Sequence, residues 1–134
     1  MSIEWNQERM STGVASIDAQ HQVFIRKINQ LLDAMEKGEG RDEVDRLIHF
    51  LGTYAREHFA HEEHVMEQRL CPARMVNKES HGQFLDNYNT LAEKYKNAGP
   101  SLSFVMEVQQ LIGEWFVRHI CKIDTQLKSC RESD

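Results

Sequence analysis

Residues 58–66 read HFAHEEHVM, which places three histidines and two glutamates within nine positions. The HEEH run at 61–64 is one residue shorter than the HExxH pattern that puts two histidines on one helical face for zinc. Apolar residues recur at helical spacing through this region, and His58 and Glu62 fall in line with them, four residues apart. These two polar side chains therefore occupy positions where a helix would bury apolar ones.

The same helical spacing of apolar residues recurs in three other segments, and each of these also carries a histidine in its apolar line. We expect helices over about residues 18–37, 41–69, 75–97 and 102–120, joined by short turns that contain glycine or proline. This pattern predicts an all-α protein, an antiparallel up-down-up-down four-helix bundle. An N-terminal arm over 1–16 and a C-terminal tail over 125–134 complete the expected architecture.

Length and composition favour a single domain over residues 1–134. The formal net charge of −5, with acids and bases interspersed, argues against a nucleic-acid partner, which needs a basic surface. No run approaches the roughly 20 apolar residues of a membrane span, and no signal peptide is visible, so we expect neither membrane insertion nor export. The three cysteines, Cys71, Cys121 and Cys130, are odd in number and irregularly spaced. We therefore expect thiols in a reducing cytoplasm, with Cys121 packed and Cys130 exposed.

Five polar residues converge at one level if the bundle forms as predicted. They are His21, His58, Glu62, His81 and His119. In an up-down-up-down bundle, the start of the first and third helices and the end of the second and fourth lie together. Burying these groups without partners would cost on the order of several kcal/mol each, because they lose their hydrogen bonds with water. A metal ion removes that cost by using their lone pairs. A hydrogen-bonded core role remains open for any single histidine, but is disfavoured for the set.

The other polar candidates are less well placed. His49 and His64 fall on the expected solvent side, and His61 falls on the flank of its helix. Asp124 follows His119 by five residues, which is about 140° around a continuous α-helix. If both residues bind one metal centre, the helix must end, tighten or bulge between them.

Five segments of the chain resemble the bacterial hemerythrins, a family of non-haem di-iron oxygen-binding four-helix bundles. The segments are IEW (3–5), GVASIDAQHQVFIRKINQL (13–31), HFAHEEHVM (58–66), CPARMVNKESHGQF (71–84) and WFVRHICKID (115–124). The resemblance implies two iron ions, cycling between Fe2+ and Fe3+ and bridged by an oxo or hydroxo group, with dioxygen as the ligand. It further implies bridging roles for Glu62 and Asp124. His21 and His58 would hold the iron with an open position. The other iron would be held by His81 and His119.

Asn77 departs from the family pattern, which has a histidine four residues before the one that corresponds to His81. An amide oxygen is a weaker ligand for iron than an imidazole. Three outcomes are open: weak ligation by Asn77, a water in its place, or substitution by His61 or Glu79. We expect an open or water-filled position.

The resemblance also implies an apolar oxygen pocket, for which Ile25, Ile112 and Trp115 are the candidate walls, although all three also fit an ordinary core. We expect an oxygen or redox sensor domain rather than an enzyme, because a missing ligand suits detection by oxidation. An oxygen store or carrier is the alternative, followed by an oxidase- or peroxidase-like enzyme and a metal-free interaction module. A sensor would need an output domain, for which the tail could lead into a longer native chain.

Overall fold

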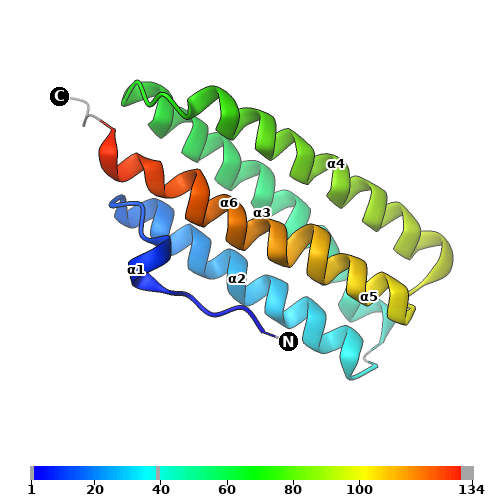
Figure 1. Ribbon diagram of the computed structural model, residues 1–134. Coiled ribbons are helices and arrows are strands. Elements are labelled where there is room, and N and C mark those ends of the chain that lie inside the picture. The colour runs from blue at the N-terminus through cyan, green and yellow to red at the C-terminus, as the bar shows by residue number, and fades with distance from the viewer. Residues whose placement is uncertain (1, 39, 131–134) are drawn as a thin grey trace.

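The structure, a computed structural model, describes residues 2–38 and 40–130 and is an antiparallel four-helix bundle (Figure 1). The first three helices are α2 (Ala15–Glu36), α3 (Arg41–Gln68) and α4 (Arg74–Ala98). The fourth is a continuous rod of three segments, α5 (Leu102–Val108), the π-helical η1 (Gln109–Glu114) and α6 (Trp115–Lys122). The part of the chain that the structure describes contains no strand, and the predicted all-α bundle is confirmed.

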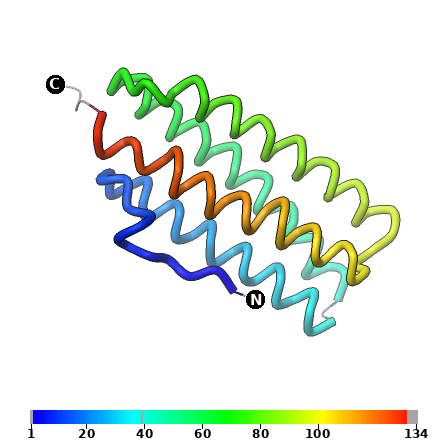
Figure 2. The backbone as a smooth tube through the Cα atoms, in the orientation of Figure 1, coloured from blue at the N-terminus to red at the C-terminus, as the bar shows by residue number. Residues whose placement is uncertain are grey.

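Each helix neighbours the next along the chain, and the fourth also packs against the first, which closes the bundle. Gly38 and Gly99 end α2 and α4 with positive φ angles of 68° and 72°, a conformation that glycine adopts without steric cost. The turns put the start of α2, the α3–α4 turn and the end of α6 at one end of the bundle (Figure 2). The expected convergence of the polar residues depends on this arrangement.

The apolar stripes of the four helices form the main core. It is built from residues such as Phe24, Ile28, Leu51, Phe84 and Phe116, all nearly or fully buried. None of the helices in the described part of the chain combines the length and the apolar character needed to cross a membrane.

The N-terminal arm lies along the outside of the bundle and contains a short helix, α1 (Gln7–Met10). The side-chain amide of Asn29 holds the arm by accepting from the Ile3 N–H and donating to the Ile3 carbonyl, both at 2.8 Å. The Ile3 side chain packs beside Gly113 in η1, where an added Cβ would lie 3.2 Å from Ile3 Cδ1. The arm therefore meets the fourth rod where its helix is widened to π geometry.

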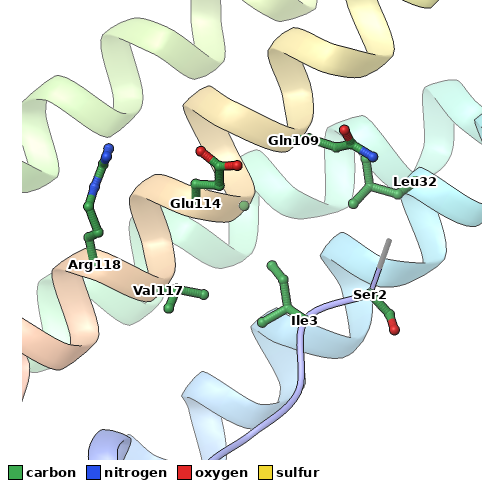
Figure 3. Close-up of a pocket in the computed structure, with 8 residues that line it drawn as sticks. Ser2, Ile3, Leu32, Gln109, Glu114, Val117 and Arg118 are labelled. Atoms are coloured by element: carbon green, nitrogen blue, oxygen red, sulfur yellow. The ribbon is translucent and has the colours of Figure 1, made fainter.

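A surface pocket of about 360 Å³ lies between the arm and the fourth rod. Figure 3 shows Ile3 between Val117 and Leu32 in this pocket. Glu114 and Arg118 also line it, whereas the polar residues predicted to converge do not.

The chain continues past α6 into a 3₁₀ helix, η2 (Asp124–Ser129), so much of the segment expected as a tail is folded. A smaller apolar cluster of Ile17, Met66, Cys71 and Leu127 packs η2 against this end of the bundle. The rest of the expected tail, 131–134, lies outside the described residues.

The expectation of unpaired cysteines was wrong for two of the three. Cys71 and Cys130 form a disulfide, with Cα atoms 5.2 Å apart, and Cys130 is half-buried rather than exposed. Their separation of 59 residues concealed the pairing, because the α3–α4 turn and the end of η2 meet only in the folded bundle. Cys121 is a free, half-buried thiol.

Candidate metal centre

The five polar residues predicted to converge do so at the end of the bundle that carries the α3–α4 turn, and Asp124, which the sequence left open, joins them. The set comprises His21 on α2, His58 and Glu62 on α3, His81 on α4, His119 on α6 and Asp124 at the start of η2, each at most 3% exposed. Four helices and the segment after them thus supply one buried cluster of imidazoles and carboxylates.

Glu62 lies between two pairs of histidines. Its Oε2 atom is 3.1 Å from Nε2 of His21 and 3.4 Å from Nε2 of His58. Its Oε1 atom is 3.0 Å from Nε2 of His81 and 3.8 Å from Nε2 of His119. Each carboxylate oxygen therefore faces one pair of imidazoles.

Asp124 spans the same two pairs. Its Oδ2 atom lies 3.1 Å from Nε2 of His21, and its Oδ1 atom lies 2.9 Å from Nε2 of His119. The geometry is possible because α6 ends at Lys122 and the chain tightens into η2 at Asp124. The helix thus ends between the two residues, as the sequence required if both face one site.

The donor atoms form two overlapping groups in which all atoms lie within 4.8 Å of one another. One group contains Glu62, His81, His119 and Asp124, and the other contains His21, His58 and Glu62. Several of the inward-facing atoms have no hydrogen-bond partner in the part of the chain that the structure describes, namely Nε2 of His58 and His119 and both carboxylate oxygens of Asp124. Buried polar atoms left in this state are costly unless a further species uses their lone pairs. Imidazole nitrogens and carboxylate oxygens suit iron, so the cluster fits an iron centre.

Three of the imidazoles are oriented by hydrogen bonds from the opposite ring nitrogen, Nδ1. His58 pairs with Gln20 Oε1, His81 with Glu63 Oε2 and His119 with Ser80 Oγ, each at 2.8 Å. The oxygens of Gln20 and Glu63 can only accept, so they place the proton of His58 and His81 on Nδ1 and leave Nε2 to face the centre, as metal-bound histidines usually require. The Ser80 hydroxyl orients His119 as either donor or acceptor. The Nδ1 atom of His21 has no partner among the described residues.

The balance of burial and nearby carboxylates raises the pKa of three of the four histidines and lowers that of the fourth. Burial alone lowers the pKa of each imidazole, but the nearby negative carboxylates of Asp124 and Glu62 raise the pKa of His21 and of His119 to about 9. The carboxylates of Glu62 and Glu63 also raise the pKa of His81. For His58, burial prevails and the pKa is lowered.

The pKa of Glu62 responds in the opposite sense. Burial raises it, but hydrogen bonds from the surrounding histidines hold it well below its usual value. Without a metal, the cluster therefore keeps its carboxylate charged and shares protons among its imidazoles. A metal ion would displace those protons.

An aromatic shell surrounds the imidazoles. The Phe59 ring stacks on His81 with centroids 3.9 Å apart, and the Phe116 ring meets His21 edge-on at 5.6 Å. Phe24 contacts both Phe116 and Phe84. These four phenylalanines were not among the pocket walls predicted from the sequence. Three of them lie three residues from a cluster histidine and therefore on its helical face, which is the signal that could have found them.

Two of the predicted pocket walls lie in the buried core, and one contacts the cluster directly. The Trp115 ring stacks on His119 with centroids 4.6 Å apart and is only partly buried. Ile25 and Ile112 are 4% and 3% exposed. Ile112 also lines a cavity of about 20 Å³ with residues such as Phe104 from the far half of the bundle.

Asn77 is fully buried on α4, and neither its amide nitrogen nor its amide oxygen has a hydrogen-bond partner among the described residues. The two residues suggested as substitutes lie elsewhere. His61 Nε2 is 3.2 Å from the Ser16 hydroxyl in an exposed contact, and the Glu79 side chain is exposed. His49 and His64 are exposed, as the sequence predicted.

The surface outside the second histidine pair is hollowed. A pocket of about 290 Å³ is lined by Ser80, Gln83, Trp115, Arg118, His119, Lys122 and Ile123. It brings His119 within reach of solvent from the side that carries two cationic residues.

Comparison with known proteins identifies the family. The model of the hemerythrin HHE cation binding domain matches residues 12–130. The bacteriohemerythrin of Pseudomonas aeruginosa (strain PAO1) is 29% identical over 114 residues, which is 85% of this chain and 72% of that protein. The bacteriohemerythrin of Stenotrophomonas maltophilia (strain R551-3) is 28% identical over the same shares of both chains. This chain belongs to the hemerythrin HHE cation binding domain family.

Solved structures agree on the fold. The crystal structure of wild-type hemerythrin superposes with a TM-score of 0.84 and 23% sequence identity, covering 96% of each chain. The crystal structure of a hemerythrin point mutant superposes with the same TM-score. Family membership makes this chain a non-haem iron, oxygen-binding type of protein rather than an enzyme.

Proposed function

We propose that this chain holds two iron ions and binds dioxygen as a sensor of oxygen or redox state. His21 and His58 would hold the first iron, and His81 and His119 the second, with Glu62 and Asp124 bridging the two. One observation carries this assignment: each carboxylate directs one oxygen to the first histidine pair and the other oxygen to the second.

When bound in the ferrous state, the iron pair supplies two electrons for reversible uptake of dioxygen. The chain's own residues set the conditions for that exchange. Glu62 and Asp124 offset the positive charge of the metals, while Gln20, Glu63 and Ser80 keep three imidazoles aimed at the centre. The phenylalanine shell excludes water, which strengthens these electrostatic interactions.

Asn77 is the feature that favours sensing over storage. We propose that it leaves the second iron with two histidines, the bridging carboxylates and an exchangeable position, open or filled by water. Its buried amide supports this proposal, because it has no hydrogen-bond partner among the described residues and could therefore hold a water in that position. The surface pocket beside His119 lies on the same side of the centre as this histidine pair. Such a site should oxidise readily, which a sensor can use and a store cannot tolerate.

Sensing also requires a downstream partner. We propose an output domain in a longer native chain, reached through the C-terminal end of this bundle, and a cytoplasmic location for the domain. The oxygen store or carrier remains the second candidate, because the same buried centre would serve reversible binding.

Repeated oxygenation separates the two candidates. Protein reduced and loaded with iron without air would be cycled between oxygen and argon while its visible spectrum is followed. A sensor should convert to a stable oxidised form within a few cycles, whereas a store should return to its deoxygenated spectrum each time. Survival through many cycles would contradict the sensor proposal and favour storage.

A further inference from the structure

The Cys71–Cys130 disulfide lies at the same end of the bundle as the metal-binding cluster but supplies none of its donor atoms. We propose that these cysteines are a second redox site of the protein, a dithiol–disulfide couple that takes a dithiol as reductant and a peroxide as oxidant. Its state controls how firmly Asp124 is held in the metal centre. The effect on iron rests on the proposed di-iron function, whereas the thiol chemistry does not.

The disulfide joins the two chain segments that flank the cluster. Cys71 lies in the turn between α3, which carries Glu62, and α4, which carries His81. Cys130 directly follows η2, whose first residue is Asp124. The disulfide therefore ties η2, which carries Asp124, to the turn that connects α3 and α4.

Apart from the contacts of Asp124 with His21 and His119 and packing against α1, few interactions tie η2 to the rest of the bundle in the described part of the chain. Leu127 packs in the small apolar cluster, and Arg69 Nη1 reaches its carbonyl only at 3.5 Å. The shorter side-chain bonds of η2 run back to the end of α6, from Thr125 and Gln126, both at 2.9 Å. Those bonds would move with η2. Breaking the disulfide should therefore loosen Asp124 without unfolding the bundle.

Exposure sets the direction of thiol exchange. Cys71 is fully buried, whereas Cys130 is half-buried at the end of the described chain. An external thiolate would attack Sγ of Cys130, and the S–S electron pair would leave on Cys71, which then takes a proton. The second thiol of the reductant resolves the mixed disulfide and releases Cys130. The chain thereby gains two electrons and two protons, and the reductant becomes a cyclic disulfide.

Reoxidation balances in the same way. The Cys130 thiolate attacks one oxygen of hydrogen peroxide and becomes a sulfenic acid. The O–O bond breaks, and the other oxygen leaves as hydroxide, which takes a proton to become water. The Cys71 thiol then displaces the sulfenic oxygen as a second water and restores the S–S bond. One hydrogen peroxide consumes two thiols and yields one disulfide and two waters.

Cys121 provides an internal control, because it is a half-buried thiol on α6 without a disulfide partner. A wild-type chain purified in air should therefore react with one equivalent of a thiol reagent under denaturing conditions, and with three after treatment with dithiothreitol. A Cys121→Ser variant should react with no equivalents before dithiothreitol treatment and with two after it. These thiol counts do not depend on iron.

The decisive experiment compares iron release to a ferrous chelator, in the absence of air, from the oxidised and the dithiothreitol-treated full chain. Iron per chain is measured first, so that absence of iron refutes the proposed function and leaves the thiol counts to test the disulfide. We expect iron release to be about tenfold faster after reduction. Metal affinity typically falls by this factor or more when the residues that support a ligand are disturbed. Cys130→Ser and Cys71→Ala should release iron at the fast rate in both states, and Cys121→Ser should behave like wild type.

Three results would overturn the proposal. One is three reactive thiols in the untreated chain, and another is a disulfide that resists dithiothreitol in the folded protein. The third is equal release rates in the two states of an iron-loaded chain. If Cys71→Ala fails to fold, Cys130→Ser carries the comparison, because Cys130 is only half-buried whereas Cys71 is fully buried.

Discussion

Asp124 Oδ1 lies 2.9 Å from Nε2 of His119, although a continuous helix would separate residues five apart by about 140°. The chain achieves the contact by ending α6 at Lys122 and tightening into a 3₁₀ helix that starts at Asp124. The other oxygen of Asp124 reaches His21 on α2. A local break in the fourth rod thus closes the cluster across the bundle.

Asp124→Asn should weaken iron binding, because the amide lacks the charge that offsets the metals and one of the two carboxylate oxygens. We expect iron per chain after dialysis against a chelator to fall from two to one or none. Asp86→Asn, an exposed position on α4, is the matched control and should keep the wild-type content. Full iron retention by Asp124→Asn would remove Asp124 from the ligand set.

Asn77→His should strengthen the second iron site, since an imidazole replaces a neutral amide one helical turn before His81. Oxidation of the reduced, iron-loaded protein in air should slow by about tenfold or more, in line with the 10–100-fold effects of metal-site substitutions. Stopped-flow absorption would measure the rate. Asn89→His, exposed on the same helix, should leave it unchanged. An unchanged rate in Asn77→His itself would refute the open position.

Glu63→Gln should disturb His81, because Oε2 of Glu63 accepts a hydrogen bond from Nδ1 of that imidazole, with the two atoms 2.8 Å apart. Loss of such a partner typically costs about 10–100-fold in metal affinity. We expect a ferrous titration to show one weakened site and one unchanged site. Glu57→Gln, exposed on the same helix, should change neither. Weakening of both sites, or of none, would contradict an effect confined to the second pair.

The metal-free protein should respond to pH through His21 and His119, whose pKa values are raised to about 9. A raised folded-state pKa contributes stability that is complete below the unfolded value of 6.5 and is lost as the pH rises through about 9. Urea unfolding of the metal-free chain should therefore show lower stability at pH 9.5 than at pH 6.5. The iron-loaded chain should not follow this trend, because metal replaces the protons. Equal or greater metal-free stability at pH 9.5 would contradict the assignment.

Two glycines should respond oppositely to alanine. A Cβ on Gly52 would lie 2.5 Å from the Tyr88 ring, so Gly52→Ala should lower the free energy of unfolding by about 1–3 kcal/mol. Gly82, inside α4, has open space beside it, and Gly82→Ala should raise stability by roughly 0.5–1 kcal/mol. Urea denaturation measures both changes. A stabilising Gly52→Ala would show that the α3–α4 contact at Tyr88 is loose.

The sequence was sufficient for the features that follow from helical periodicity. The four apolar stripes predicted the bundle, and the placement of His21, His58, Glu62, His81 and His119 in those stripes predicted their convergence. Asp124 could be weighed only as a conditional case, because periodicity describes regular helices and cannot locate the point at which α6 ends.

Other features depend on contacts between distant segments. The Cys71–Cys130 pairing needs the α3–α4 turn and the end of η2 to meet, which spacing along the chain does not encode. The π-helical widening at η1 accommodates Ile3 of the arm beside Gly113, a contact across the bundle surface. The aromatic shell was visible in the spacing of the phenylalanines, but these residues also fitted an ordinary core.

The most direct test of a bridged iron pair is an anaerobic titration of the metal-free chain with ferrous iron, followed by Mössbauer spectroscopy after oxidation. A bridged pair should give two irons per chain and a magnetically coupled ferric pair with no net spin. A single iron per chain, or two irons that behave as isolated ferric ions, would contradict the bridging roles of Glu62 and Asp124.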